Sequence, residues 1–96
     1  MVKKKETKFI LRLFVAGLSP KSLKAINNVK KLSDKHMKDN YDLEIIDIYQ
    51  KPEAALSGEI IAAPTLIKEL PKPLKKFVGD MSAEDKILAG LFLKKE

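Results

Sequence analysis

The chain contains no cysteine and only one histidine, His36. The lack of cysteine excludes disulfides, iron–sulfur clusters, thiolate zinc sites and every cysteine nucleophile. Asp34 and Asp39 flank His36, but a metal site combines several strong ligands, so we interpret all three as the polar end of a helix. Nothing pairs a serine with the one available base, and the glycines lie too far apart for a phosphate-binding loop. The sequence therefore predicts a protein that is not an enzyme and has no cofactor or metal.

Long apolar runs are also lacking. The longest one near the N-terminus, Phe9 to Leu18, is short and is interrupted by Arg12, so no membrane-spanning segment is predicted. The first residues are basic, as in a signal peptide, but a strand-like alternation follows them and no small-residue cleavage site is present. We therefore expect a cytoplasmic protein without membrane contact. It should consist of a flexible basic tail, residues 1–7, and one domain, residues 8–96.

The formal net charge is +6. An excess of this size can attract nucleic acid, a membrane surface or an acidic protein. The lysines are spread along the chain, with local groups only at Lys3–Lys5 and at Lys72, Lys75 and Lys76. We therefore interpret most of them as solvated surface charges that keep a small protein soluble.

One motif is typical of RNA binding. The segment Leu13–Leu18 is similar to the first-strand motif of RNA-recognition domains, in which an aromatic ring, here Phe14, stacks on a base. Those domains carry two further aromatic residues around a glycine on a later strand. Here Lys75–Gly79 has a single aromatic residue in a different order. The interpretation of Phe14 as a core residue is stronger, so we do not expect a nucleic-acid partner.

The clearest strand of the sequence is Lys8–Ala16. Apolar residues alternate with the others at Phe9, Leu11, Leu13 and Val15, which is the period of a strand. The opposite face is also largely apolar. A strand that is apolar on both faces is typical of the middle of a sheet covered on both sides, so we expect this strand to be central.

A helix and a second strand follow. Ser19 and Pro20 are typical of a helix start, with a capping hydroxyl before a proline in the first turn. An amphipathic helix is predicted to about Met37 from four apolar residues at three-residue spacing, Leu23, Ile26, Val29 and Leu32. Leu43–Tyr49 predicts a strand that is apolar on both faces. Two strands joined by a helix of this length form a βαβ unit, so they should be parallel.

The chain changes from helix to strand around Pro64. Pro52–Ile61 predicts a short helix, weakened in its second half by Gly58. Proline cannot donate to a sheet ladder, so we place Pro64 at the beginning of a strand that runs over Thr65–Glu69. A joint of this kind is a place where an X–Pro bond can be locked, and we expect the Ala63–Pro64 bond to be cis.

The remaining segments complete an α/β pattern. Two prolines make Leu70–Pro73 a turn, after which Leu74–Val78 predicts a fourth strand that forms a hairpin with the third. Ser82 should cap a last helix, with Asp85 in a weak capping box. The buried stripe of that helix is predicted to be Ile87, Leu88, Leu91 and Phe92. The expected order is β-α-β-α-β-β-α.

With these elements assigned, the chain resembles the KaiB family of small clock proteins over Leu11 to Leu91. The segments that carry the resemblance, in order, are Leu13-Phe14-Val15-Ala16-Gly17, Ser19-Pro20-Lys21-Ser22, Ile46-Asp47-Ile48, Lys51-Pro52, Ala63-Pro64-Thr65-Leu66, Leu70–Lys76, Val78–Ser82, Lys86-Ile87-Leu88 and Gly90-Leu91. The chain departs from the family pattern at Ser57–Glu59 and at Phe92, which identifies it as a divergent relative.

The resemblance implies a fold and a partner. KaiB proteins are related to thioredoxins, and they are known for changing fold: the second half is either α-β-β-α, as in thioredoxins, or βααβ in tetramers. The order predicted above is the thioredoxin-like one, with Pro64 as the family's cis-proline. The implied partner is KaiC, a hexameric ATPase whose phosphorylation the family modulates, and a homo-oligomer, dimer or tetramer, is implied as well. The redox cysteines of thioredoxins would fall at Gly17–Pro20, where this chain has no thiol.

The resemblance also implies which residues bind the partner. The expected binding residues, in the half that changes fold, are Lys51, Pro52, Glu53, Ser57 and Glu59, with Lys75 and Lys76 nearby. Gly90 and Phe92 mark the fold-switch region. Two alternatives stay open: a redox-inactive thioredoxin-like adaptor that acts in a stress response outside any clock, and an RNA-binding module.

Overall fold

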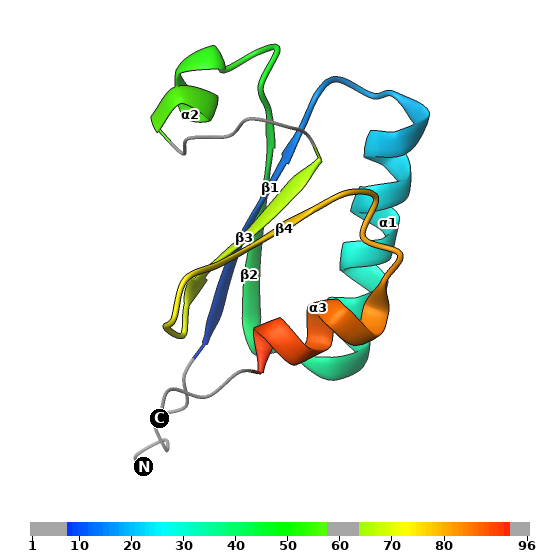
Figure 1. Ribbon diagram of the computed structural model, residues 1–96, viewed down its shortest axis with the longest axis vertical. Coiled ribbons are helices and arrows are strands. Elements are labelled where there is room, and N and C mark those ends of the chain that lie inside the picture. The colour runs from blue at the N-terminus through cyan, green and yellow to red at the C-terminus, as the bar shows by residue number, and fades with distance from the viewer. Residues whose placement is uncertain (1–7, 58–63, 93–96) are drawn as a thin grey trace.

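The computed structural model describes residues 8–57 and 64–92 (Figure 1). The elements in order are β1 (Phe9–Val15), α1 (Pro20–His36), β2 (Tyr41–Asp47), α2 (Pro52–Ser57), β3 (Thr65–Leu70), β4 (Lys75–Val78) and α3 (Glu84–Leu91). This order confirms the predicted β-α-β-α-β-β-α pattern. The basic tail, residues 1–7, lies outside the described residues. No described helix is long and apolar enough to cross a membrane.

The four strands form one sheet in the order β2-β1-β3-β4. Strand β1 pairs with β2 in parallel and with β3 antiparallel, and β3 pairs with β4 antiparallel. The predicted central position of β1, the parallel βαβ unit and the hairpin are therefore confirmed. The second strand carries apolar side chains on both faces, as predicted: Leu43 packs against the main core cluster, and Ile46 belongs to the cluster on the opposite face. It is an edge strand, and the side chains of Asp42 and Glu44 are exposed.

The two faces of the sheet are covered unequally. Figure 1 shows α1 and α3 together on one side and α2 on the other side, near one end of the strands. The main core lies under α1 and α3, where Leu13 and Leu66 pack with Val29 and Leu91. A smaller cluster on the opposite face consists of Phe14, Ile46 and Ile67. The burial of Phe14 confirms that it is a core residue.

The two long helices begin differently. Ser19 Oγ accepts a hydrogen bond from Ser22 N at 3.2 Å, which confirms the predicted cap of α1. The predicted cap of α3 is wrong, because Ala83 occupies the N-cap position and makes no side-chain cap bond. Ser82 lies one residue too early. Its backbone N donates instead to Asp80 Oδ1 at 3.0 Å, so an aspartate turn takes up the residue expected to start the helix.

The end of α3 also differs from the prediction. Ile87 and Leu91 are buried and Leu88 is partly buried, as expected. Phe92 is not part of the buried stripe: it is the C-cap residue, it is 45% exposed, and its ring meets the edge of Phe9 with the centroids 5.3 Å apart. The helix has ended by this residue, so the helical period no longer directs the side chain into the core.

Pro64 lies immediately before β3, as predicted. Its side chain is buried, and its carbonyl accepts a hydrogen bond from Gly79 N at 3.0 Å. The predicted cis bond between Ala63 and Pro64 lies outside the described residues. The cis peptide bonds found in the described part of the chain are Leu70–Pro71 and Lys72–Pro73, both in the turn between β3 and β4.

Candidate functional site

Large apolar side chains are exposed at the end of the sheet where β1, β2 and β4 finish and where α2 lies (Figure 1). They are Leu18 at 75%, Tyr49 at 73%, Leu56 at 79% and Val78 at 68%. Soluble proteins seldom leave such side chains grouped in solvent unless the surface binds something. In open α/β sheets, binding also concentrates at the carboxyl ends of the strands. We call Leu18, Tyr49, Lys51, Pro52, Glu53 and Leu56 the α2 surface.

Part of the predicted binding set lies on this surface. Lys51, Pro52 and Glu53 are exposed, with Pro52 as the first residue of α2 and Glu53 in its first turn. A carboxylate in the first turn is favoured by the partial positive charge of a helix N-terminus. Ser57 is the last residue of α2, and Glu59 lies outside the described residues. The partner-binding role of these residues stays a prediction.

Asp47 holds the loops beneath the α2 surface. Its Oδ1 accepts hydrogen bonds from Gly17 N at 3.0 Å and from Tyr49 N at 2.9 Å, so one carboxylate joins the loop after β1 to the loop after β2. Gly17 has φ +68, and a Cβ added there would lie 3.2 Å from the Tyr49 ring. Only glycine meets both demands comfortably. The exposed side chains of Leu18 and Tyr49 are thus carried on loops that are fixed to each other.

The sequence motif alone does not single out Leu18, Tyr49 and Leu56. Each is one apolar residue in a loop or short helix, and a single exposed apolar residue is ordinary. The signal that could have found them is topological: two of them lie in the loops that follow parallel strands, and these strands end at the same edge of the sheet. Without the strand order, their proximity cannot be recognised.

The basic pair on β4 is divided between the two faces of the sheet. Lys75 pairs with Lys68 and shares its face, which α3 covers, whereas the exposed Lys76 pairs with Ile67 and points to the opposite face. Lys75 is also three residues from Val78, or roughly 10 Å along the strand from the end where α2 lies. The structure therefore does not bring both lysines to the α2 surface, and only Lys76 lies on the same side of the sheet as α2.

A buried lysine, which the sequence did not reveal, holds the end of α3. Lys68 is 0% exposed, and its Nζ donates to the carbonyl oxygens of Gly90 and Leu91, both at 3.3 Å. Burial lowers the pKa of Lys68, and the charge of Lys75 lowers it further. The predicted fold-switch residue Gly90 thus has Lys68 bound to its carbonyl oxygen and the Phe77 ring close to its Cα. A Cβ added at Gly90 would lie 2.6 Å from that ring.

The single histidine belongs to a charged contact between α1 and α3. His36 Nε2 lies 3.1 Å from Glu84 Oε2, and Lys35 Nζ lies 3.8 Å from the same oxygen. The hydrogen bond from His36, followed by the charge of Lys35, lowers the pKa of Glu84. Asp34 instead accepts a hydrogen bond from the Tyr41 hydroxyl at 2.7 Å, which raises the pKa of Tyr41. No cluster of metal-binding side chains occurs within residues 8–57 and 64–92.

The resemblance implies that Gly17–Pro20 corresponds to the segment in which thioredoxins carry their redox cysteines. This chain has no thiol there. Ser19 uses its oxygen to cap α1 and lies 3.0 Å from the Ser22 hydroxyl, and Pro20 begins the helix. These residues serve to start α1, and without a thiol they cannot carry out thiol–disulfide exchange.

Comparison with solved structures defines the class of the fold. The N-terminal domain of SasA from Synechococcus elongatus superimposes with a TM-score of 0.79, over 100% of this chain and 93% of that domain, at 18% sequence identity. Mitochondrial thioredoxin 3 from Saccharomyces cerevisiae gives a TM-score of 0.70 over 91% of this chain and 79% of its own, also at 18% identity. The protein has a thioredoxin-like α/β fold.

Sequence comparison then gives the family. The KaiB domain model matches residues 12–93. The circadian clock protein KaiB3 of Synechocystis is 42% identical over 84 residues, which are 88% of this chain and 82% of the relative. The circadian clock oscillator protein KaiB of Nostoc punctiforme is 39% identical over 93 residues, covering 97% and 88%. The chain belongs to the KaiB family, and its curated relatives are circadian clock proteins.

Proposed function

We propose that this chain is a regulatory binding protein without catalytic activity, which docks on a KaiC-type hexameric ATPase and modulates its phosphorylation state or output. The observation that carries the proposal is the α2 surface of a KaiB-family chain. There Leu18, Tyr49 and Leu56 expose apolar area beside the charges of Lys51 and Glu53. Apolar anchors with charged neighbours are the usual composition of a protein–protein interface.

The thioredoxin-like arrangement supports this use of α2. The resemblance implies that family members expose this helix for binding only in that arrangement, which is the one described above. If other molecules adopt the βααβ form, the apparent dissociation constant rises in inverse proportion to the binding-competent fraction. The homo-oligomer and the cytoplasmic location expected from the resemblance stay predictions.

The test is a calorimetric or surface-based titration of the protein against a purified KaiC-type ATPase with nucleotide present. Two variants alter the α2 surface, Leu56→Ser and Glu53→Lys. Two controls alter other surfaces. Leu74→Ser makes the matched apolar-to-polar change at an exposed residue beside the β3–β4 turn, and Lys30→Glu reverses a charge of the opposite sign on α1. We expect each α2 variant to cost upward of about 1 kcal/mol of binding free energy, and the controls to cost much less.

Two results would count against the proposal in different ways. If the control variants weaken binding as much as the α2 variants, the ATPase binds elsewhere and the surface assignment is wrong. If the wild-type protein does not bind the ATPase at all, the clock-type role fails for this chain. The redox-inactive adaptor then takes its place, and a pull-down that recovers partners without any KaiC-type ATPase would support it.

A further inference from the structure

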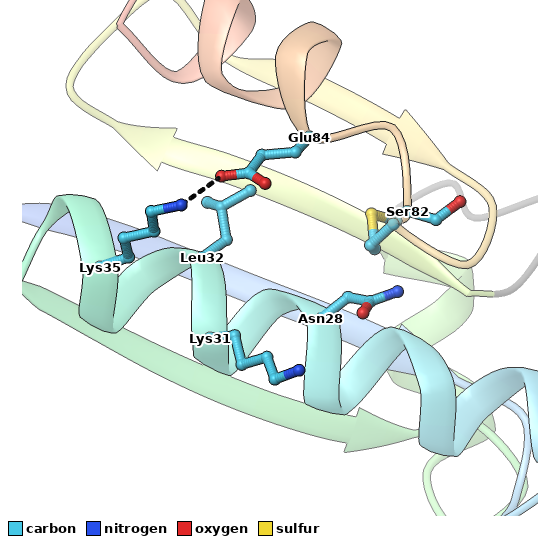
Figure 2. Close-up of a pocket in the computed structure, with 7 residues that line it drawn as sticks. Asn28, Lys31, Leu32, Lys35, Ser82 and Glu84 are labelled. Carbon is cyan, nitrogen blue, oxygen red and sulfur yellow. Dashed lines mark ion pairs between the residues drawn. The ribbon is translucent and has the colours of Figure 1, made fainter.

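A hollow lies on the side of the sheet opposite the α2 surface. Its volume is about 270 Å³, and it is bounded by α1 and by the segment that joins β4 to α3. Figure 2 shows Lys35 and Glu84 closing one end, with Asn28 and Ser82 at the other end and Lys31 between them on α1. We call this hollow the α1 groove. Its lining residues are Asn28, Lys31, Leu32, Lys35, Met81, Ser82 and Glu84.

The groove lies on a strongly basic helix. Within its 17 residues, α1 carries five lysines and one aspartate. The carboxylates at the rim of the groove are already engaged, since Asp80 pairs with Lys24 at 3.6 Å and Glu84 with Lys35 at 3.8 Å. Lys31 is exposed and has no ion-pair partner in the part of the chain that the structure describes. The charge left over in the groove is therefore positive.

The wall of the groove is built in advance. Asp80 is held by several contacts. Its carbonyl accepts from Asn28 Nδ2 at 2.9 Å, and its Oδ1 accepts from Ser82 N at 3.0 Å. Its carboxylate also accepts from the Ser82 hydroxyl, and its Oδ2 lies 3.6 Å from Lys24 Nζ. Met81, between Asp80 and Ser82, is buried and has φ +66, a left-handed backbone conformation that residues other than glycine rarely adopt. A strained residue of this kind persists only where its surroundings hold it, so the groove does not need to form on binding.

We propose that the α1 groove docks an acidic segment of a partner protein, with a carboxylate of that segment beside Lys31. Buried Leu32 and Met81 provide an apolar floor for the aliphatic part of a glutamate side chain. Electrostatic complementarity of this kind gives specificity and fast association, and it weakens as salt rises.

The composition of the groove favours an acidic peptide over nucleic acid. A single strand of nucleic acid needs a continuous basic track and aromatic side chains on which bases stack. The residues that line the groove include no aromatic side chain, and the carboxylate of Glu84 interrupts the basic track. A peptide can place one or two carboxylates beside Lys31 and keep the rest of its chain clear of Glu84.

The experiment measures fluorescence anisotropy of a fluorescein-labelled octaglutamate peptide titrated with the full chain. The test variant is Lys31→Glu. Its matched control is Lys30→Glu, which makes the same charge change at the neighbouring residue of α1 but lines a different hollow, with Asp34 and Tyr41. We expect Lys31→Glu to weaken binding roughly tenfold or more and Lys30→Glu to weaken it less than about threefold. Lys31→Arg should retain binding.

Three outcomes would overturn the proposal. Equal weakening by Lys31→Glu and Lys30→Glu would mean that the peptide responds only to net charge. A lack of saturable binding at about 20 mM salt, where surface charges are little screened, would mean that the groove does not accept acidic peptides. Tighter, Lys31-dependent binding of a thymidine octanucleotide would assign the groove to nucleic acid instead. Circular dichroism of each variant verifies that α1 is intact.

Discussion

We expect the buried side chain of Lys68 to make the free energy of unfolding depend on pH below the ordinary lysine pKa. The side chain is 0% exposed, and its hydrogen-bond acceptors are the last carbonyls of α3. Attraction to a helix C-terminus contributes about 0.3–1 kcal/mol, whereas removing an ammonium from water costs several kcal/mol. Desolvation therefore exceeds the attraction to the carbonyls, and the neighbouring Lys75 adds repulsion. This explains why the pKa of Lys68 is lowered.

The direction of the pH effect follows from this shift. The unfolded chain holds the Lys68 proton up to the ordinary lysine pKa of about 10.4, while the folded chain releases it at lower pH. Between these two values the unfolded state binds more protons, so the free energy of unfolding rises with pH. One proton limits the slope to about 1.4 kcal/mol per pH unit. Below the folded pKa this contribution is flat, and the fold carries the full cost of the buried charge.

The assay is urea unfolding of the wild type and of Lys68→Met at intervals between about pH 7 and pH 10. Methionine keeps an unbranched chain but does not titrate. We expect the wild type to gain stability relative to Lys68→Met as pH rises over the upper part of this range. Lys72→Met, at an exposed lysine in the turn, should run parallel to the wild type. Parallel curves for the wild type and Lys68→Met would refute the reasoning.

Three further predictions concern helix ends. Ser19→Ala should lower the free energy of unfolding by about 1 kcal/mol, measured by urea unfolding, whereas Ser19→Asp should preserve it by keeping a cap. Gly90→Ala should destabilise the wild type because the new Cβ meets the Phe77 ring. In a Phe77→Ile background the same substitution should raise the free energy of unfolding by about 0.5–1 kcal/mol through helix propensity. A change in stability of the same sign in both backgrounds would contradict the contact. The hydrogen bond from His36 lowers the pKa of Glu84. The stability it contributes is therefore present above the ordinary glutamate pKa and is lost as pH falls through the folded pKa. In Glu84→Gln, the melting temperature should depend less on pH between about pH 5 and pH 3 than in the wild type.

The order of elements could be predicted because local signals and tertiary structure agree in this chain. Alternation over β1, the Ser19 cap and the prolines that bound the β3–β4 turn each specify one kind of structure. The prediction failed where a neighbouring element decides the outcome. The start of α3 depends on the turn made by Asp80, and the exposure of Phe92 depends on where α3 ends. Neither fact is local to the residues concerned.

The candidate site was predictable in part for the same reason. Lys51, Pro52 and Glu53 were found from the resemblance and are exposed together at the start of α2. The separation of Lys75 from Lys76 follows from strand alternation, once the hairpin register is known. The apolar residues of the α2 surface and the α1 groove could not be predicted, because each combines loops or helices that only the folded sheet brings together.

The attachments of α3 differ in kind from those of α1. Helix α1 has a side-chain cap and a proline in its first turn, and it buries Ala25, Val29 and Leu32. Helix α3 is eight residues long, has no side-chain cap and contains a glycine, which costs a helix about 1 kcal/mol relative to alanine.

Two contacts that fix α3 also carry a penalty or depend on solution conditions. Lys68 reaches the C-terminal carbonyls of α3 only by burying a charge. Glu84 fixes the first turn of α3 through an exposed ion pair with Lys35, which salt weakens. What remains is the burial of Ile87 and Leu91 against the sheet. Each side chain contributes about 1.5–3 kcal/mol when fully buried, so the hold on α3 is of the same order as the penalties. Of the two helices that cover this face of the sheet, the physical chemistry of their contacts selects α3, the helix that contains Gly90, as the one that separates first.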